Sequence, residues 1–419
     1  MNAQDFSEPK TVFEILGIES GDVPTTPHRC IIPPRREGTP ELPPPGIYFD
    51  MPMHVYVSLP AVSNTGVKHL AASPMIFWGK SWLNPRNAPR EAKHFIYGEA
   101  YHSRIGEGRD VFWDRYAPEY QVDPERKDIL NTVEEIKDAI SKRPVGNSGS
   151  FHSPVVNVEE PDGNGGTKKR KAKREDWVRQ LLEIDPDAPL AENLERIYNE
   201  QHPGKIFLPH DLIDNIELSA MMIERDEGIA PYFRNGFAEV TLIWFCPATG
   251  VPMKCRVDYM KVRRMVDLKT FENQRLRAPE TAIRYEISSY KYNVQPSVYI
   301  EGGREVRQLV REHGASAIYV CGDPSPERVE QCQAFAFKWA KHIEHDLWTW
   351  IFQMKGDAPI TRAVDYPMGS VKMVTDDIVS LAKKRFAEYA TVFGADPWID
   401  SAPAYTIADE DIPLSATEI

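Results

Sequence analysis

Cysteine is scarce in this sequence, and no two cysteines form a CxxC pair. The five that occur are spread widely, from Cys30 to Cys332. An odd number at wide spacing is typical of reduced thiols and does not fit a disulfide framework. Zinc ribbons need closely spaced cysteine pairs, so a structural zinc site of that type is excluded.

Long apolar runs are also missing. No stretch approaches the roughly twenty apolar residues that a membrane-spanning helix needs. The first residues, MNAQDFSE, have neither the basic start nor the apolar core of a signal peptide. We therefore expect no contact with a membrane and a location in the cytoplasm.

Positive charge does not dominate the chain either. Its 62 acidic residues outnumber its 50 lysines and arginines, for a net charge of −12. Proteins that coat nucleic acid nonspecifically usually carry a basic surface, so this class is disfavoured. An enzyme that acts on DNA is not excluded, because carboxylates around a divalent cation are acidic and a local basic lining can still guide phosphates.

The composition predicts ordered structure joined by irregular segments, because 35 prolines accompany 42% hydrophobic residues. We predict a Pro-rich, largely irregular arm over residues 1–55, a folded domain over 56–393 and an irregular tail over 394–419. Residues 143–174, rich in Gly, Ser and Asn, are expected to form an exposed insertion. The insertion ends in the basic run KKRKAKR, which is more often a solvated loop than a DNA contact.

Hydrophobic periodicity predicts an α/β fold. Residues 238–245, 253–259 and 265–270 are rich in β-branched and aromatic side chains and should form three consecutive strands of a core sheet, with helices on both sides. Ser63 and Ser73 are expected to cap the first two helices. The predicted helices are 64–72, 74–82, 94–105, 174–200, 209–227, 280–313, 326–354 and 375–393, the last capped by Thr375, and a short strand is expected at 317–321.

Two acidic residues and a lysine fall on neighbouring strands of this predicted sheet. Side chains two residues apart share a face of a strand, so Asp267 and Lys269 should point the same way. If the second and third strands pair about the bend between them, Asp258 comes beside both. Carboxylate oxygens are the ligands that Mg²⁺ prefers, and Mg²⁺ keeps positions open for water and phosphate.

This arrangement predicts metal-assisted hydrolysis, with Lys269 orienting the attacking water or neutralising charge on the phosphate. Taken alone, however, Asp-x-Lys is a frequent pattern. An exposed ion pair on an edge strand would then be the commoner explanation.

Two further motifs change this balance. A Gly-x-x-x-His motif, Gly98–His102, lies upstream, and a Gln-x-x-x-Tyr motif, Gln295–Tyr299, lies downstream. Together with Asp258 and the Asp-x-Lys at Asp267, this order resembles the PD-(D/E)XK nuclease superfamily, in its RecB-like branch. It resembles most the RecE (exonuclease VIII) type of phage recombination exonuclease. The resemblance covers residues 56–299 and implies a restriction-endonuclease-like core, in which a small mixed sheet is flanked by helices and carries helical insertions.

The resemblance implies a role for each matching residue. His102, Asp258 and Asp267 would be metal ligands, and the backbone carbonyl of Leu268 would be a further ligand. Asp258, Asp267 and Lys269 would form the catalytic group.

Three other residues would support this group. Glu239, just ahead of a predicted strand, matches an acidic position of the family. Gln295 and Tyr299, one helical turn apart, would face the site and contact DNA or orient the metal ligands. Pro296 between them requires their helix to begin at Gln295 or to kink.

The same resemblance implies the cofactors and partners. The metal would be Mg²⁺, with Mn²⁺ as a substitute. Some members of the branch hold an iron–sulfur cluster, but Ser73 stands in the place of its first cysteine, so no cluster is expected. No Walker motif occurs, so no use of ATP is expected. The expected partners are double-stranded DNA ends, a single-strand annealing protein and further copies of the chain, in the host cytoplasm if the chain is phage-encoded.

The favoured function is therefore an ATP-independent exonuclease on double-stranded DNA ends, and three alternatives stay open. The first is a nuclease of another substrate or polarity, such as a structure-specific or single-strand enzyme. The second is a noncatalytic DNA-binding module that retains the fold, although the complete set of ligand residues argues against a decayed site. The third makes the Pro-rich arm and the insertion docking surfaces for other proteins.

Overall fold

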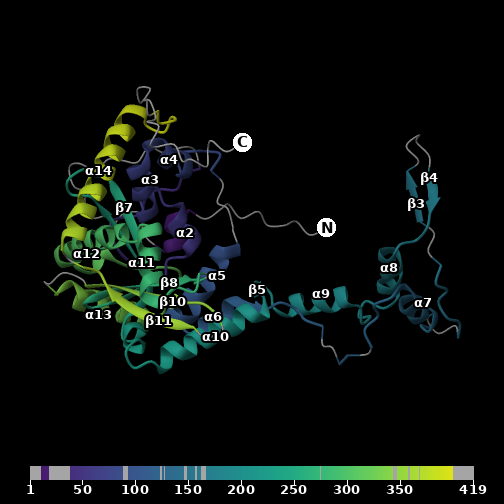
Figure 1. The fold of residues 1–419 in the computed structure, drawn as a ribbon. Coiled ribbons are helices and arrows are strands. Elements are labelled where there is room, and N and C mark those ends of the chain that lie inside the picture. The colour runs from purple at the N-terminus through teal and green to yellow at the C-terminus, as the bar shows by residue number, and fades with distance from the viewer. Residues whose placement is uncertain are drawn as a thin grey trace, which may run out of the picture. The chain divides into compact units, whose positions relative to one another are not determined.

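The computed structural model separates the chain into two compact units (Figure 1). One unit comprises residues 1–109 and 215–419, and the other comprises residues 110–214. No helix in the described part of the chain is long and apolar enough to cross a membrane. The described residues are 11–17, 38–87, 93–122, 125–126, 128–145, 149–155, 158–161, 167–273, 275–342, 347–356, 359–367 and 369–399.

The larger unit is built on a seven-stranded mixed sheet with the order β11-β10-β8-β7-β6-β1-β9. Strands β6, β7 and β8 form an antiparallel meander, while β10 runs parallel to β8 and β9 parallel to β1. The strands are β1 Gly46–Phe49, β6 Phe237–Phe245, β7 Pro252–Lys261, β8 Arg264–Phe271, β9 Ile318–Val320, β10 Leu347–Met354 and β11 Ile360–Asp365.

Helices cover both faces of this sheet. Ile47 and Leu242 pack in the main hydrophobic cluster, together with residues of α12. Their neighbours Tyr48 and Ile243 point the other way and pack in a second cluster with residues of α1 and α2. The helices of this unit are α1 Val12–Leu16, α2 Met53–Ser58, α3 Asn64–Ala72, α4 Pro74–Lys80, α5 Lys93–His102, the π-helix Ser103–Glu107, the 3-10 turns Ala230–Phe233 and Gly314–Ala317, α11 Pro279–Ser289, α12 Val294–His313, α13 Pro326–Ala340 and α14 Ser370–Phe393.

The smaller unit, residues 110–214, has a hydrophobic cluster of its own, in which Ile136 and Ile140 of α7 pack with Trp177 and Leu181 of α8. It also holds a hairpin of β3 and β4 within residues 143–174, where the sequence lacks the alternation that would predict strands. The elements are β2 Tyr116–Pro118, α7 Val133–Ser141, β3 Val158–Pro161, β4 Thr167–Arg170, α8 Arg174–Ile184, α9 Ala191–Gln201 and β5 Ile206–Leu208, while α6 Arg109–Arg115 and α10 His210–Arg225 cross the unit boundaries.

Within the described residues, the sheet confirms the three predicted central strands and the short strand predicted at 317–321, which is β9, and adds β1, β10 and β11. Strand β1 lies inside the segment 1–55 that we predicted to be largely irregular, so the sheet uses part of that segment. Residues 1–10 and 18–37 of the predicted arm and 400–419 of the predicted tail lie outside the described residues.

The predicted helix 326–354 is wrong beyond Ala340, because residues 347–354 form β10. Seven of these eight residues are buried between β8 and β11. A continuous apolar run of this kind suits a strand that is covered on both faces, and periodicity alone cannot distinguish it from a buried helix.

Helix boundaries also differ from the prediction at several points. Ser63 and Ser73 do cap α3 and α4 through their side chains. The predicted helix 280–313 is two helices, α11 and α12, and the predicted helix 174–200 is also two, α8 and α9. Helix α14 begins at Ser370, so Thr375 is not its cap and instead bonds through Oγ1 to the carbonyl of Val371.

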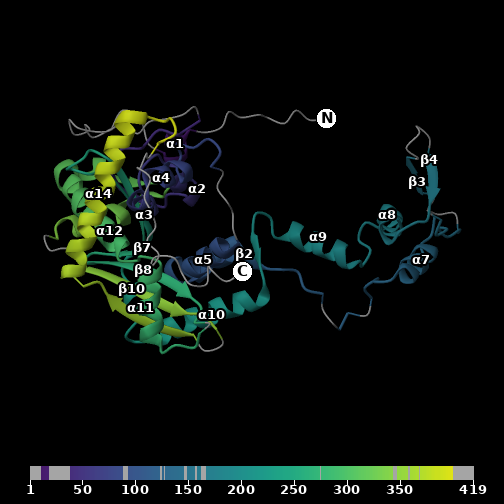
Figure 2. The same ribbon diagram turned by 45° about the horizontal axis from the view of Figure 1, so that its top comes forward.

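Helix α12 lies very close to β6, and α14 runs along α12 in both views (Figures 1 and 2). At Gly302 the contact leaves no room for a side chain, because a Cβ atom there would lie 2.6 Å from Cζ3 of Trp244. Glu301 joins the elements by accepting a hydrogen bond from Trp244 Nε1 and forming an ion pair with buried Lys383 of α14.

Gly302→Ala is expected to lower the thermal midpoint of unfolding. Alanine favours a helix over glycine by about 1 kcal/mol, but forcing a methyl group against Trp244 in a packed core costs about 1–3 kcal/mol. Thermal unfolding followed by circular dichroism measures the balance.

The control is Gly98→Ala in α5, where a Cβ atom would meet nothing within 4 Å. That variant should unfold at the wild-type temperature or above it. A midpoint of Gly302→Ala equal to or higher than that of the wild type would show that α12 does not depend on this close approach.

Candidate metal centre

The ladder between β6 and β7 is interrupted at one position. Pairing continues on both sides, but Glu239 of β6 and Asp258 of β7 are left out of it. Glu239 has a φ of +54°, in the left-handed region that side chains rarely adopt within a strand. Val257 and Met260 both pack in the main hydrophobic cluster. In a regular strand, residues three apart would face opposite sides of the sheet, so the alternation of side chains along β7 is broken between them. Irregularities of this kind redirect side chains beside functional sites.

Strands β7 and β8 separate at the same level of the sheet. Their pairing ends at Tyr259 and Val266, so Asp258 and Asp267 are the next opposing positions. There the side chain of Asp258 replaces the ladder, because its Oδ2 accepts a hydrogen bond of 2.8 Å from the backbone N–H of Leu268. Two carboxylates therefore lie in a gap between strands, as the spacing of the sequence predicted.

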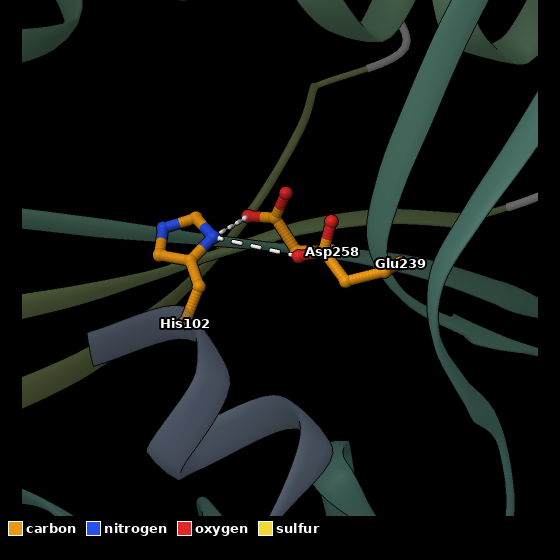
Figure 3. Close-up of side chains that lie close together, drawn as sticks. All are labelled: His102, Glu239 and Asp258. Atoms are coloured by element: carbon orange, nitrogen blue, oxygen red, sulfur yellow. Dashed lines mark ion pairs between the residues drawn. The ribbon is translucent and has the colours of Figure 1, made fainter. Parts of the chain in front are cut away.

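His102 reaches this gap from the last residue of α5. Its Nδ1 lies 3.5 Å from Asp258 Oδ2 and 3.9 Å from Glu239 Oε1. Figure 3 shows the three side chains pointing toward one another, the imidazole from its helix and the carboxylates from their strands. One ligand atom from each residue lies within 4.8 Å of the other two.

The π-helix Ser103–Glu107 follows His102 directly and holds its end of α5 in place. Arg104 in this turn is buried, and its guanidinium pairs with Glu217 and Glu224 of α10, both at 2.9 Å. Single π-helical turns are rare and often occur at functional sites.

Two side chains, those of Lys269 and Gln295, hold the carboxylate of Asp267. Its Oδ2 lies 2.6 Å from Nζ of Lys269, and its Oδ1 accepts a hydrogen bond of 2.5 Å from Nε2 of Gln295. Asp267 is 1% exposed and Gln295 is 6% exposed. The carboxylate is thus oriented by a charged and a neutral donor inside the protein.

Burial is the largest influence on the ionisation of each acid. It raises the pKa of Asp258 to about 7, with Lys269 opposing the rise and Glu239 adding to it. It raises the pKa of Asp267 to about 6, and Lys269 again opposes the rise. Burial favours the neutral form of Lys269, but Asp267 and Asp258 outweigh it and raise the pKa of the ammonium.

Burial lowers the pKa of His102, although Glu239 raises it, so the imidazole is neutral at pH 7. A neutral imidazole and ionised carboxylates are donors for a divalent cation. The backbone of Leu268 also raises the pKa of His102 and so opposes the effect of burial, while the role of its carbonyl as a metal ligand stays a prediction. The donor set therefore fits a metal, and His102, Glu239 and Asp258 form the candidate site.

Glu239 lies closer to the centre of this site than its sequence position suggested. It lies near the start of β6, as the strand predicted over 238–245 requires, and its carboxylate also pairs with the guanidinium of Arg256. Arg256 donates in addition to the carbonyl of Met51, at 2.6 Å. In the sequence, the only indication that Arg256 lies near the site was its position on the same strand as Asp258, two residues earlier.

The Gln-x-x-x-Tyr motif opens helix α12. Pro296 is the third residue of this helix, where no backbone N–H is needed, so it causes no kink. Gln295 contacts Asp267, while Tyr299 is buried and packs edge-on against Trp348, with ring centroids 5.1 Å apart. The role predicted for Tyr299 in contacting DNA stays a prediction.

Two further residues near Lys269 were not identified from the sequence. Nζ of Lys269 lies 5.2 Å from the ring centroid of Tyr292, and Nζ of Lys68 lies 5.5 Å from the same centroid. Neither residue belongs to a recognisable motif, and the three come from separate parts of the chain.

Comparison with known proteins gives a family match over part of the chain. Residues 173–318 match a family described as a PDDEXK-like domain of unknown function (DUF3799). This segment contains every site residue from Glu239 to Tyr299 and excludes His102. No curated protein matches the chain.

Among solved structures, the chain matches the crystal structure of a "Putative exonuclease" from Eubacterium rectale. The two are 12% identical with a TM-score of 0.34, and the match covers 78% of this chain and 82% of the other. The mixed sheet flanked by helices is consistent with a PD-(D/E)XK-like domain, and the family match with the acidic and histidine cluster makes the chain a candidate nuclease.

The raised pKa of Asp258 predicts a pH-dependent stability of the metal-free protein. Its folded pKa, about 7, lies above the unfolded value of about 4. The folded state therefore binds the proton more tightly, and the destabilisation caused by the ionised form is complete above pH 7 and absent below pH 4. Asp258→Asn should raise the unfolding midpoint in EDTA at pH 8, by an amount that shrinks toward pH 5.

The matched control is Asp377→Asn, an exposed position on α14. Its midpoint should follow that of the wild type across the pH range. A variant at Asp258 that is less stable than the wild type at pH 8, or a difference that does not change with pH, would contradict the assignment.

Proposed function

We propose that this chain is a Mg²⁺-dependent deoxyribonuclease that hydrolyses phosphodiester bonds from the ends of double-stranded DNA. The observation that carries the proposal is the meeting of Asp258, Asp267 and Lys269 in one gap of the sheet, with His102 at its edge. The PDDEXK-like family match over the strands that carry the three residues supports it.

The ligands in this proposal are His102, Asp258, Asp267 and the carbonyl of Leu268, and Glu239 is a further candidate because it lies with His102 and Asp258. A bound divalent cation in such a site supplies charge stabilisation at the phosphate and a lowered pKa of bound water. Mn²⁺ has similar preferences for oxygen and imidazole ligands and would be a substitute.

In this proposal, Lys269 supplies a positively charged side chain at the reacting phosphate, in addition to the metal. Its ammonium is held 2.6 Å from Asp267 Oδ2, and the raised pKa keeps it protonated at neutral pH. A fixed positive charge in a buried site stabilises the charge that develops on phosphate oxygens better than the same charge in water.

Two neutral donors fix the directions of the carboxylates. The backbone N–H of Leu268 binds Asp258, and the side-chain amide of Gln295 binds Asp267. Groups that orient ligands in this way preserve the geometry of a metal site, and their loss typically lowers metal affinity or activity by about 10–100-fold. Leu268 and Gln295 are therefore positioning groups.

We extend the proposal to the biological setting on the strength of the sequence resemblance. The enzyme would act in phage-type recombination without ATP, as a homo-oligomer that retains DNA, and would pass a single strand to an annealing protein. The net charge of −12 is compatible with this role, because the substrate would be guided by local basic residues.

A digestion assay tests the function directly. Purified protein is incubated with linear and with circular duplex DNA, in Mg²⁺ or in EDTA, beside Asp267→Ala. We expect nucleotides to be released from linear DNA only, and release to be lost in EDTA and in the variant. Labelling one end at a time gives the polarity. An intact linear substrate in Mg²⁺ and in Mn²⁺ would exclude the enzyme and favour a noncatalytic DNA-binding protein.

Lys269→Met should lower kcat by about 100- to 1,000-fold, because it removes a preorganised charge while keeping the length of the side chain. Mg²⁺ binding should persist, since the carboxylates remain. Rapid-quench measurement of the first turnover isolates this step. The control is Lys338→Met, an exposed lysine on α13, which should leave the rate unchanged. Equal rates for Lys269→Met and the wild type would remove Lys269 from the reaction.

A further inference from the structure

Three elements meet at the ring of Tyr292, beside the candidate centre. Tyr292 lies in the link between α11 and α12, Lys269 comes from β8 and Lys68 from α3. Nζ of Lys269 and Nζ of Lys68 lie 5.2 Å and 5.5 Å from the ring centroid, within the range of cation–π attraction. Lys68 is thus connected to the catalytic lysine of the proposed enzyme through one aromatic ring.

A second tyrosine extends this arrangement toward solvent. The ring of Tyr290 stacks on Tyr292, with centroids 5.6 Å apart and planes inclined by 17°. Tyr290 is 58% exposed, so the stack begins beside Lys269 and ends at the surface. An aromatic ring so exposed adds little to the core and presents an apolar face to solvent.

The link that carries both rings is held in a specific conformation. Lys291 between the two tyrosines has a φ of +51°, which a lysine rarely adopts. Nζ of Lys68 donates to the carbonyl of Tyr290 at 2.7 Å, and Asn293 donates to Thr375 Oγ1 of α14 at 2.9 Å. The stack is therefore preorganised by α3 on one side and by α14 on the other.

Lys269 is paired with Asp267, but Lys68 beside it has no ion-pair partner among the described residues. Lys68 has three N–H donors, and within the described residues its Nζ makes one hydrogen bond, to a carbonyl, and no ion pair. Burial lowers the pKa of Lys68 to about 8, and Lys269 and Lys291 lower it further while Asp267 opposes them. An anion bound here would relieve this repulsion and hold the ammonium in its charged form.

A phosphate with a base attached matches both halves of this arrangement. We propose that Lys68 and the Tyr290–Tyr292 stack form a subsite for one unpaired nucleotide at the end of a DNA strand, next to the phosphate held at Lys269. Lys68 binds a backbone phosphate, and the exposed face of Tyr290 stacks on the base. The assignment of the ligand to DNA rests on the proposed nuclease function.

Such a subsite would select DNA substrates by whether the terminal base is paired or unpaired. A stacking face has no pattern of donors and acceptors, so it accepts any base but requires that the base be unpaired. A duplex with a frayed or single-stranded end would therefore enter more readily than a blunt, GC-rich end, because unpairing the base costs free energy.

Binding in EDTA separates this subsite from hydrolysis. A duplex with a short unpaired end that carries 2-aminopurine as its terminal base is titrated with protein, and fluorescence and anisotropy are recorded. Stacking on Tyr290 should quench the fluorescence. Tyr290→Ala should abolish the quenching and weaken binding about tenfold, while Tyr290→Phe, which keeps the ring, should behave as the wild type does.

Lys68 is tested by the salt dependence of the same titration. Lys68→Gln should weaken binding for all sequences and lower the slope of log K against log salt by about 0.7 to 1. Lys68→Arg should retain the slope. The controls are Tyr285→Ala, an exposed ring on α11 that lies outside the stack, and Lys338→Gln on α13. Both should bind as the wild type does.

The outcomes distinguish the two proposals. Unchanged quenching and affinity in Tyr290→Ala, or no binding of this duplex by the wild type, overturn the subsite. If those results accompany normal digestion in Mg²⁺, the nuclease proposal stands without it. Loss of quenching in Tyr290→Ala with recovery in Tyr290→Phe supports the subsite, even if a failure to digest DNA overturns the nuclease proposal.

Discussion

The attraction between Lys269 and the carboxylate of Asp267 is the interaction on which the candidate centre depends. Asp267 is almost fully buried, and the side chain of Asp258 beside it is only 16% exposed. Removing ionised groups from water costs several kcal/mol each unless they are paired and hydrogen-bonded. Lys269 offsets this cost for both acids, while Leu268 and Gln295 supply a directed donor to each of them. The remaining excess of negative charge, increased by Glu239, is what a divalent cation would neutralise.

This charge cluster exists because the sheet stops pairing where it lies. Glu239 and Asp258 drop out of the ladder between β6 and β7, and β7 separates from β8 beyond Tyr259. A continuous ladder would have used the backbone N–H of Leu268, which instead holds Asp258. The gap is stable because β10 pairs with β8 on its other side and keeps the strand in the sheet.

Packing far from the charges sets the position of Gln295. Gly302 lies two helical turns after Gln295 on α12, so the two residues share a face of the helix. The absence of a side chain at Gly302 lets α12 settle on Trp244, and Glu301 links this contact to Lys383 of α14. The helix can then bring the amide of Gln295 within 2.5 Å of Asp267. The same α14 holds the link that carries Tyr290, so one helix supports both the centre and the proposed subsite.

Local pattern in the sequence was enough for the three central strands, the capped helices α3 and α4, and the grouping of Asp258, Asp267 and Lys269. Strands of alternating residues joined by a short bend have few ways to pair, so the opposition of Asp258 and Asp267 followed from spacing alone. Strand β10 was misassigned because a buried apolar run has the same composition in a helix and in a strand. The smaller unit of residues 110–214 was not anticipated, since its helices are short and its hairpin is polar.

Only the tertiary structure decided which distant residues join the centre. The left-handed backbone at Glu239 turns its carboxylate toward His102, and no local pattern predicts such a conformation for a glutamate inside a strand. Lys68 and Tyr292 are separated from each other by more than half of the chain, and the approach of α3 to the α11–α12 link brings them together. Within a hairpin, the number of residues along the backbone determines which side chains lie opposite each other. Contacts between distant elements depend instead on how the faces of those elements pack.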